Sequence, residues 1–314
     1  LCSGASMGAN SVLSAAGIPQ VSPTSSSPSL SDDAAYPLFY RIIPSDGLQG
    51  GALNFTVSNY GGSSVALIHM TNSYGAGIAD SFRTSWEAGG NTLCAQIGYE
   101  ETSTSFGALA QSVLDNGCDT VVMASYSSDG QMIAEALVDI GFSGSIFGGD
   151  GIADESFGSD LSDPSLVNGI IATKPRPHNT SSVSDAFDTW CSNNSTCNSG
   201  ILQAETYDAV RIIGESYLYS QTSGIPLGWS LFVIGYHWQG ASGEITFISN
   251  GDSIGHGFEI CQFSYSSGTG QVTLSCPETW YPSTNLLVSL AIPVTAIISL
   301  SISSVAPFFL AAKL

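Results

Sequence analysis

The sequence contains very few basic residues. Six lysine and arginine residues stand against 26 aspartate and glutamate residues, which gives a formal net charge of −20 at pH 7. Binding to nucleic acid needs clustered cations that neutralise phosphates, so we exclude nucleic acid as a partner. Charged residues make up only 10% of the 314 residues. This composition is too apolar for a disordered chain, and the length suffices for two domains.

Signatures of cofactor binding and catalysis are also missing. The sequence has no Walker loop and no G-x-G-x-x-G loop, and its four histidines and seven cysteines are too scattered for a zinc site. Residues 4–8 match the G-x-S-x-G pattern of a hydrolase nucleophile elbow. That elbow needs a preceding strand and a later acidic residue and histidine, which no further motif here supplies. We therefore expect no cofactor, no metal and no enzymatic activity.

The cysteines indicate an oxidising compartment. Cys191 and Cys197 bracket a short loop, Cys261 and Cys276 flank another, and Cys94 and Cys118 each lie at the mouth of a predicted strand. Buried thiols are the alternative, but glycosylation sequons at Asn54, Asn179, Asn193 and Asn194 also favour the cell exterior. Cys2 is the odd cysteine. No signal peptide precedes it, and we expect the sequence to be a piece that has lost its start.

The C-terminal residues form a long uncharged hydrophobic run. Residues 286–312 contain no charged residue, and about 20 apolar residues cross a bilayer as a helix. Trp280 and Tyr281 precede the run as an interfacial belt, and Lys313 follows it on the expected cytoplasmic side. We therefore expect a linker at 276–285 and a transmembrane helix at 286–312 that holds the binding domain outside the cell. A buried core helix and a tail removed on lipid anchoring are the alternatives.

Strands and helices alternate between residues 62 and 151. Continuous apolar runs at 64–70, 119–125 and 145–148 indicate buried strands, and 92–97 is strand-like. The helix expected before the 119–125 strand has apolar residues at i, i+3, i+4, i+7 and i+8, namely Phe106, Leu109, Ala110, Val113 and Leu114. Apolar strands alternating with helices predict an α/β fold with a doubly wound parallel sheet covered on both faces.

Polar residues follow three of these strands, at one edge of the predicted sheet. Tyr74 follows the first strand, Tyr126 follows the 119–125 strand, and Asp150 and Gly151 follow the last. Ligands of open parallel sheets bind beyond the carboxyl ends of the strands. A carboxylate there can pair with a ligand ammonium group, and tyrosines supply rigid walls. A helix N-cap is the alternative role for Asp150.

Hydroxyl groups near the start of the chain offer a site for an anion. Ser3 lies near a predicted helix, and Thr24, Ser25 and Ser26 lie in a Ser/Pro-rich loop. Hydroxyls and free amides at helix N-termini bind anions such as carboxylates. The alternative is a solvated Ser/Pro turn, and the composition of this segment supports the two interpretations equally. Further along, we interpret Asp208 as a structural residue at a helix start.

Several of these segments together carry a family resemblance. The motifs occur in the order LCSG, SPTSSSP, FYRIIPSDGLQGGAL, NSYGAG, SYSSDGQMIAEAL, FGGDG and ETYDAV. In this order the chain resembles, from residue 1 to about 270, the leucine/isoleucine/valine-binding proteins. These are type I periplasmic binding proteins, the receptors of ABC importers.

The resemblance implies roles for eight residues. It implies that Ser3, Thr24, Ser25 and Ser26 hold the ligand carboxylate, that Tyr74 and Tyr126 are pocket aromatics of the opposite lobe, and that Asp150, followed by Gly151, takes the ligand ammonium. Asp150 stands where leucine binders have glutamate, so the resemblance does not imply specificity for branched-chain amino acids.

The resemblance also implies two doubly wound lobes joined by a hinge that closes on the ligand. Lobe one, incomplete at its N-terminus, would comprise 1–43 and 176–248, and lobe two 44–175 and 249–275. We expect an extracellular substrate-binding protein that captures an amino acid or similar solute for an ABC permease. The ligand-binding ectodomain of a membrane signalling receptor is the alternative, and an adhesion protein with an empty cleft is a third class.

Overall fold

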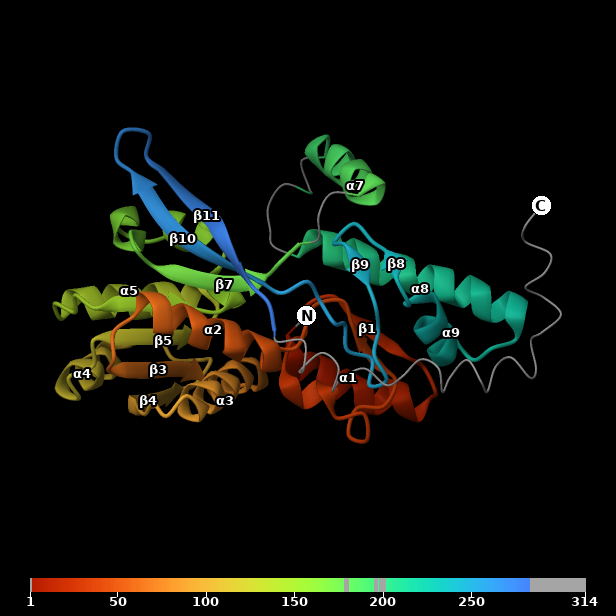
Figure 1. The fold of residues 1–314 in the computed structure, drawn as a ribbon, viewed down its shortest axis with the longest axis horizontal. Helices are drawn as coiled ribbons and strands as arrows, with labels where there is room; N and C mark the ends of the chain where they lie inside the picture. The colour runs from red at the N-terminus through yellow and green to blue at the C-terminus, as the bar shows by residue number, and fades with distance from the viewer. Residues whose placement is uncertain (1, 178–180, 195–196, 198–201, 283–314) are drawn as a thin grey trace. The chain divides into compact units, whose positions relative to one another are not determined.

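A seven-stranded sheet dominates the residues that the computed structural model describes, which are 2–177, 181–194, 197 and 202–282 (Figure 1). The strands, in chain order, are β3 (Val65–Met70), β4 (Leu93–Tyr99), β5 (Thr120–Ala124), β6 (Ser145–Gly148), β7 (Ile171–Pro175), β10 (Phe258–Ser266) and β11 (Gln271–Trp280). Their order across the sheet is β11-β10-β7-β6-β5-β3-β4. The five strands from β7 to β4 are parallel, and β10 and β11 are antiparallel additions.

Helices cover both faces of this sheet, and we call the sheet with its helices lobe two. They are α2 (Asp46–Tyr60), α3 (Ser73–Ala88), α4 (Gly107–Asp115), α5 (Ser127–Asp139), α6 (Glu155–Ser159) and the 3-10 turns η2 (Asp150–Ile152) and η3 (Pro164–Val167). Helices α2 and α3 pack together on one face, and α4, α5 and α6 lie on the other, as right-handed crossovers require. A Cβ on Gly50 of α2 would lie 2.4 Å from the Ser81 backbone of α3, so this helix contact needs glycine. The predicted covered parallel sheet is confirmed.

Lobe one contains two two-stranded sheets and the longest of the described helices. Its elements are α1 (Ser3–Ala15), β1 (Gln20–Ser22), η1 (Pro28–Ser31), β2 (Phe39–Arg41), α7 (Ser182–Ser192), α8 (Gln203–Ser223), α9 (Leu227–Ile234), β8 (Trp238–Gln239) and β9 (Glu244–Ile245). Strands β1 and β2 form a two-stranded parallel sheet. A separate core forms where Tyr40, Ile212, Leu231 and Phe247 meet. Lobe one therefore has its own hydrophobic centre, and the predicted two-lobe α/β fold is confirmed.

A buried ion pair ties lobe one to the segment that crosses back toward lobe two. The Arg41 side chain is fully buried, and its guanidinium lies 2.7 Å from the Asp252 carboxylate. The same guanidinium donates to the Ser27 carbonyl at 2.9 Å and to the Ser31 hydroxyl at 2.6 Å. Because Arg41 ends β2, the pair fixes this strand, the serine-containing loop and the returning chain together.

Six of the seven cysteines are joined in pairs. The disulfides are Cys94–Cys118, Cys191–Cys197 and Cys261–Cys276. Cys2 is free and exposed. The first disulfide links the start of β4 to the segment before β5, and the last crosses between β10 and β11. The interpretation that these cysteines form disulfides, rather than staying buried thiols, is confirmed.

The expected transmembrane helix is corrected. Among the described residues, no helix is both long and apolar enough to cross a bilayer. The longest helix, α8, has 21 residues, but it carries Glu205, Asp208, Arg211 and Glu215, and the bilayer core disfavours such charges. The predicted segment 286–312 itself lies outside the described residues, as does the sequon at Asn179.

Candidate ligand-binding site

Asp150 lies at the carboxyl edge of the sheet, directly after β6. Its side chain is buried, with 8% of the residue's surface exposed. The Tyr74 hydroxyl, from the first turn of α3, donates to the Asp150 carboxylate at 2.8 Å. The backbone N–H of Gly151 donates to the same hydroxyl at 2.9 Å. The ends of β3 and β6 are thus connected through side chains, as the parallel topology predicts.

Tyr126 and Gly151 complete this group. Tyr126 follows β5, and its ring stacks on that of Tyr74 with centroids 4.9 Å apart and planes 10° apart. A Cβ on Gly151 would lie 2.6 Å from the Tyr74 hydroxyl and 2.4 Å from the Ser125 carbonyl oxygen. Only glycine therefore allows the backbone to approach Tyr74 this closely. The structure brings Tyr74, Tyr126, Asp150 and Gly151 together.

The predicted hydroxyl residues form a second group, around the N-terminus of α1. The Ser3 hydroxyl accepts a hydrogen bond from the Ser27 backbone N–H at 3.1 Å. The hydroxyls of Ser6 and Ser25 are hydrogen-bonded at 2.8 Å. The buried Ser26 hydroxyl has no hydrogen-bond partner among the described residues, and Thr24 is half-buried beside it. The loop is therefore fixed against α1, and the Ser26 hydroxyl interacts with the Asp46 carboxyl without a hydrogen bond of normal geometry.

Asp46, the first residue of α2, connects the two groups. Its backbone N–H donates to the Ser26 carbonyl at 2.9 Å. Its carboxylate is buried, and neither oxygen makes a hydrogen bond of normal geometry within the described residues. Burial, and secondarily the charge of Asp150, raise the pKa of Asp46 well above its usual value, while Ser26 and Arg41 act in the opposite direction. The Ser26 hydroxyl and the charge of Arg41 thus only partly offset the burial of this carboxyl, and a cation would stabilise its charged form.

Asp150 is also held in a poorly solvated position. Burial raises the pKa of Asp150, although hydrogen bonds from Tyr74, Gln49 and Gly151 favour the charged carboxylate. Burial and the neighbouring carboxylates Asp150 and Asp46 raise the pKa of Tyr74 well above its usual value. Tyr74 therefore stays a neutral hydrogen-bond donor. Two carboxyls in one buried place disfavour each other's ionisation, and a bound cation would relieve this.

A cavity of about 440 Å³ opens beside Asp150. Lobe two contributes Asp150 and Lys174, and lobe one contributes residues of α7 and of the first turn of α8, together with Ser242. The volume is within the usual range for small-molecule sites. Asp150 is the one predicted site residue among those that line it. The predicted serines and tyrosines are not part of its wall.

Three further charged residues line this cavity, and none of them is predicted from the sequence. They are Lys174 at the end of β7, Asp188 on α7 and Glu205 on α8. Asp208, one turn after Glu205, accepts hydrogen bonds from the backbone N–H groups of Ala241 and Ser242 at 2.8 and 2.7 Å. Asp208 thus has the structural role that we interpret from the sequence, and it holds Ser242 at the cavity. The ETYDAV motif contains Glu205, but nothing in that pattern distinguishes it from an ordinary helix-start acid.

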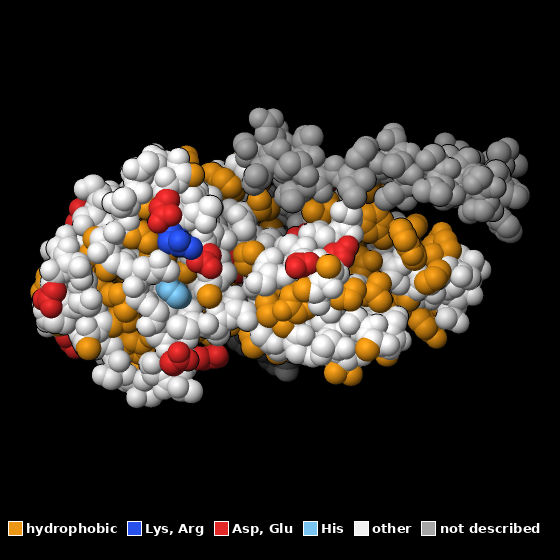
Figure 2. Space-filling view, turned by 90° about the horizontal axis from the view of Figure 1, so that it is seen from below, with side chains coloured by type: hydrophobic (Ala, Val, Ile, Leu, Met, Phe, Trp, Pro, Cys, Tyr) orange, Lys and Arg blue, Asp and Glu red, His pale blue; other side chains and the backbone are white. Residues whose placement is uncertain are grey.

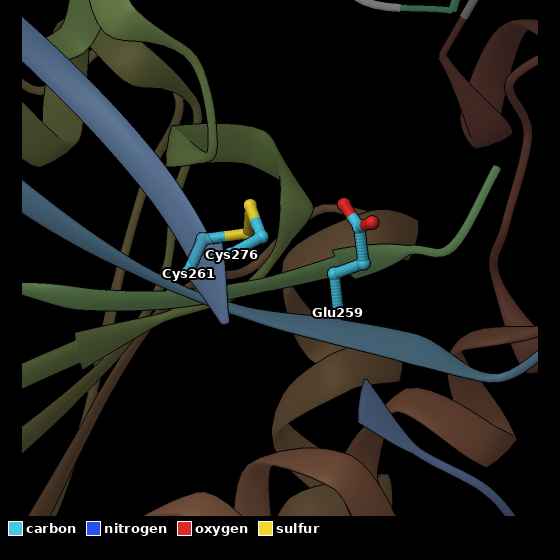
Figure 3. Close-up of side chains that lie close together, drawn as sticks. All are labelled: Glu259, Cys261 and Cys276. Atoms are coloured by element: carbon cyan, nitrogen blue, oxygen red, sulfur yellow. A yellow bond between two sulfur atoms is a disulfide. The ribbon is translucent and has the colours of Figure 1, made fainter. Parts of the chain in front are cut away.

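Glu259, Cys261 and Cys276 form a cluster that resembles a metal site by residue type (Figure 3). The two sulfurs are bonded to each other, so neither is a thiolate ligand. Glu259 lies 3.6 Å from the Lys174 ammonium. Glu259 therefore helps to position Lys174 at the cavity. The three residues do not offer three ligands to an ion, because the two cysteines are joined.

Comparison with known proteins places the chain in a family. The model of the receptor family ligand binding region matches residues 1–266. The chain belongs to this family. The resemblance to type I periplasmic binding proteins is thereby confirmed, and the matched region of the family is a ligand binding region.

Individual relatives agree with this assignment. The Leu/Ile/Val-binding protein BraC3 of Rhizobium johnstonii is 27% identical over 176 residues, which cover 55% of this chain and 48% of that protein. The chain therefore spans about half the length of the curated relatives it matches. A leucine-binding protein from Thermotoga maritima has a similar fold, with a TM-score of 0.76 and 18% identity over 88% of this chain and 77% of that one. A 58-residue stretch is 45% identical to the metabotropic glutamate receptor of Drosophila melanogaster, covering 18% of this chain and 6% of that receptor.

Proposed function

We propose that this chain is the ligand-binding region of an extracellular protein that captures an amino acid or a similar small polar solute. The observation that carries the proposal is the buried Asp150 carboxylate, held by Tyr74 at the carboxyl edge of the sheet and bordering a cavity of about 440 Å³. A carboxylate placed at this edge is suited to receive a ligand ammonium group.

Capture works by closing one lobe over the other. Asp150 belongs to lobe two, and the Ser3 and Thr24–Ser26 hydroxyls belong to lobe one. The hydroxyls do not line the cavity in this structure, and closure would have to bring them to the ligand. A zwitterion held at its ammonium by Asp150 and at its carboxylate by the hydroxyls would then contact both lobes and stabilise the closed state over the open one. We propose lobe one as 1–43 with 176–248 and lobe two as 44–175 with 249–280. β11 (Gln271–Trp280) extends lobe two past residue 275 into the segment 276–285 that we expect from the sequence to be a linker.

The three disulfides support a location outside the cytoplasm, because disulfides persist in oxidising compartments. Within that location we propose delivery of the ligand to an ABC permease. A signalling receptor ectodomain is the second candidate, and the short stretch shared with a metabotropic glutamate receptor favours it. Both candidates need the same ligand chemistry at Asp150, so one experiment tests their common basis.

The test is calorimetric titration of the full chain with a panel of L-amino acids. We expect at least one to bind, and Asp150→Asn to weaken that binding by about 2–5 kcal/mol, the usual penalty for removing one partner of a desolvated charge pair. Asp129 provides a matched control. It is equally buried, at 8% exposure, and the Tyr99 hydroxyl donates to it at 3.5 Å much as Tyr74 does to Asp150.

The control variant Asp129→Asn should leave affinity unchanged, because Asp129 does not line the cavity. Equal affinity of wild type and Asp150→Asn would refute the proposed role of Asp150. Absence of binding by every amino acid in the panel would refute amino acid capture itself.

A further inference from the structure

The charges around the cavity are unbalanced. Three carboxylates line it, Asp150, Asp188 and Glu205, against one cation, Lys174. That cation is already engaged, because its ammonium group lies 3.6 Å from the Glu259 carboxylate. A zwitterionic amino acid adds no net charge, so it would leave this excess of negative charge in place when the lobes close over it. Enclosing unbalanced carboxylates is unfavourable unless they are paired.

Glu205 is the carboxylate best placed to receive a second positive charge. It lies in the first turn of α8, on the lobe one side of the cavity, whereas Asp150 lies on the lobe two side. Among the described residues it forms no ion pair within 4.0 Å. Burial raises the pKa of Glu205, and the charge of Asp208 adds to this, while a hydrogen bond from its own backbone N–H and the charge of Lys174 act in the opposite direction. Burial outweighs the groups that favour the charged carboxylate, so a ligand cation would stabilise it further.

The plain alternative is that Glu205 only stabilises the start of α8. Acidic residues in a first helical turn interact favourably with the helix dipole. Asp208, the other acid near this end, has such a structural use, because it holds residues 241–242 through three hydrogen bonds. Glu205 has no comparable partner and borders the cavity instead. Asp46, which does not line the cavity, adds a further buried carboxyl close enough to Asp150 for the two charges to interact.

We infer that the cavity is selective for an amino acid with a cationic side chain, and that Glu205 is the residue that receives that second cation. The inference rests on the proposed function and specifies its ligand class. Asp150 takes the α-ammonium from lobe two, and Glu205 takes the side-chain ammonium or guanidinium from lobe one. The two contacts come from opposite lobes, so a basic amino acid joins them across the cavity and favours closure more than a neutral one does.

The test compares L-lysine with L-norleucine, which has the same carbon chain without the terminal ammonium group. Titration calorimetry on the full chain measures both ligands with wild type, Glu205→Gln and the control Glu87→Gln. Glu87 is an exposed residue of α3, so its substitution changes the net charge equally without touching the cavity. Circular dichroism and the melting temperature confirm that each variant is folded.

We expect wild type to bind lysine at least about tenfold more tightly than norleucine, the selectivity that a hydrogen bond to a charged group provides. Glu205→Gln should remove most of this preference and leave norleucine affinity nearly unchanged, and Glu87→Gln should retain the preference. If Glu205→Gln does not fold, the ratio of lysine to norleucine affinity in wild type decides the question.

Two results would overturn the inference, and they differ in what else they overturn. If norleucine binds wild type as tightly as lysine, or if Glu205→Gln weakens both ligands equally, the second cation site is wrong while amino acid capture stands. If neither these two ligands nor any other amino acid binds, the proposed function fails together with the inference.

Discussion

The two lobes differ in how completely their own residues bury their apolar side chains. In lobe two every residue of β5 is buried, and the core continues through both helical layers. Lobe one has two described sheets of two strands each, and apolar side chains gather on its surface, as Figure 2 shows. The most exposed of these on α8 and α9 are Val210, Leu218 and Trp229, at 70%, 66% and 61% exposure. From this difference we expect lobe two to hold Asp150 more rigidly than lobe one holds its own residues, with lobe one as the less constrained lobe in the proposed closure.

The largest effect is expected from breaking the connection at Arg41. Arg41→Leu leaves Asp252 buried without its partner, which should lower the free energy of unfolding by about 3–5 kcal/mol. Arg83→Leu is the control, because Arg83 and Asp80 are 2.8 Å apart on the surface of α3. An exposed pair contributes below about 1 kcal/mol. Urea unfolding measures both, and similar losses would contradict the structural role given to Arg41.

A matched pair of core leucines tests the comparison of the lobes directly. Leu67 in β3 and Leu231 in α9 are both fully buried. Substitution of either by alanine should cost about 2–5 kcal/mol, with the larger loss where the surroundings collapse least. We expect the larger loss for Leu67→Ala, since lobe two is packed on both faces of its sheet. Urea unfolding measures the losses. An equal or larger loss for Leu231→Ala would show that lobe one is as tightly packed.

Gly151 tests how rigidly lobe two holds its part of the site. Gly151→Ala places a methyl group against the Tyr74 hydroxyl and the Ser125 carbonyl. This overpacking should lower stability by about 1–3 kcal/mol and displace the Tyr74–Asp150 hydrogen bond. Amino acid affinity, measured by calorimetry, should fall as well. Gly107→Ala is the control, because a Cβ there meets no atom within 4 Å, and unchanged affinity in Gly151→Ala would contradict the close fit.

The smallest effect is expected from the pH dependence of the ligand-free protein. Burial raises the pKa of Asp46 in the folded state, so the folded chain binds a proton that the unfolded chain releases above the ordinary aspartate pKa. Stability therefore decreases as pH rises from that ordinary value through the raised one. Asp46→Asn should reduce this decrease and raise the melting temperature at neutral pH. Thermal melts from pH 4 to 8 measure this, and a wild-type stability that increases over the range would contradict it.

The fold of lobe two was largely predictable from the sequence, for a physical reason. Buried parallel strands are continuous apolar runs, so the predicted segments 64–70, 119–125 and 145–148 match β3, β5 and β6 closely. β11 was not predicted, because its buried and exposed residues alternate weakly along an edge of the sheet. The sequence pattern there gives little information about burial.

The site was predictable only where topology determines it. Tyr74, Tyr126 and Asp150 follow parallel strands, so their meeting at one edge follows from the strand order. Asp46 and Glu205 lie in the first turns of α2 and α8, where acidic residues are common for reasons unrelated to ligands. Whether Asp46 and Glu205 take part in a ligand site depends on which groups the folded chain places around them. No local sequence pattern contains that information.

Replacing the ammonium group of the ligand, rather than a residue of the protein, tests most directly whether Asp150 pairs with a ligand cation. L-Leucine and L-lysine are each titrated calorimetrically against their α-hydroxy acid analogues, in which a hydroxyl replaces the α-ammonium. We predict that wild type binds whichever amino acid it accepts far more tightly than the hydroxy acid, and that Asp150→Asn loses this discrimination. Equal binding of amino acid and hydroxy acid by wild type would contradict the pairing of Asp150 with a ligand cation.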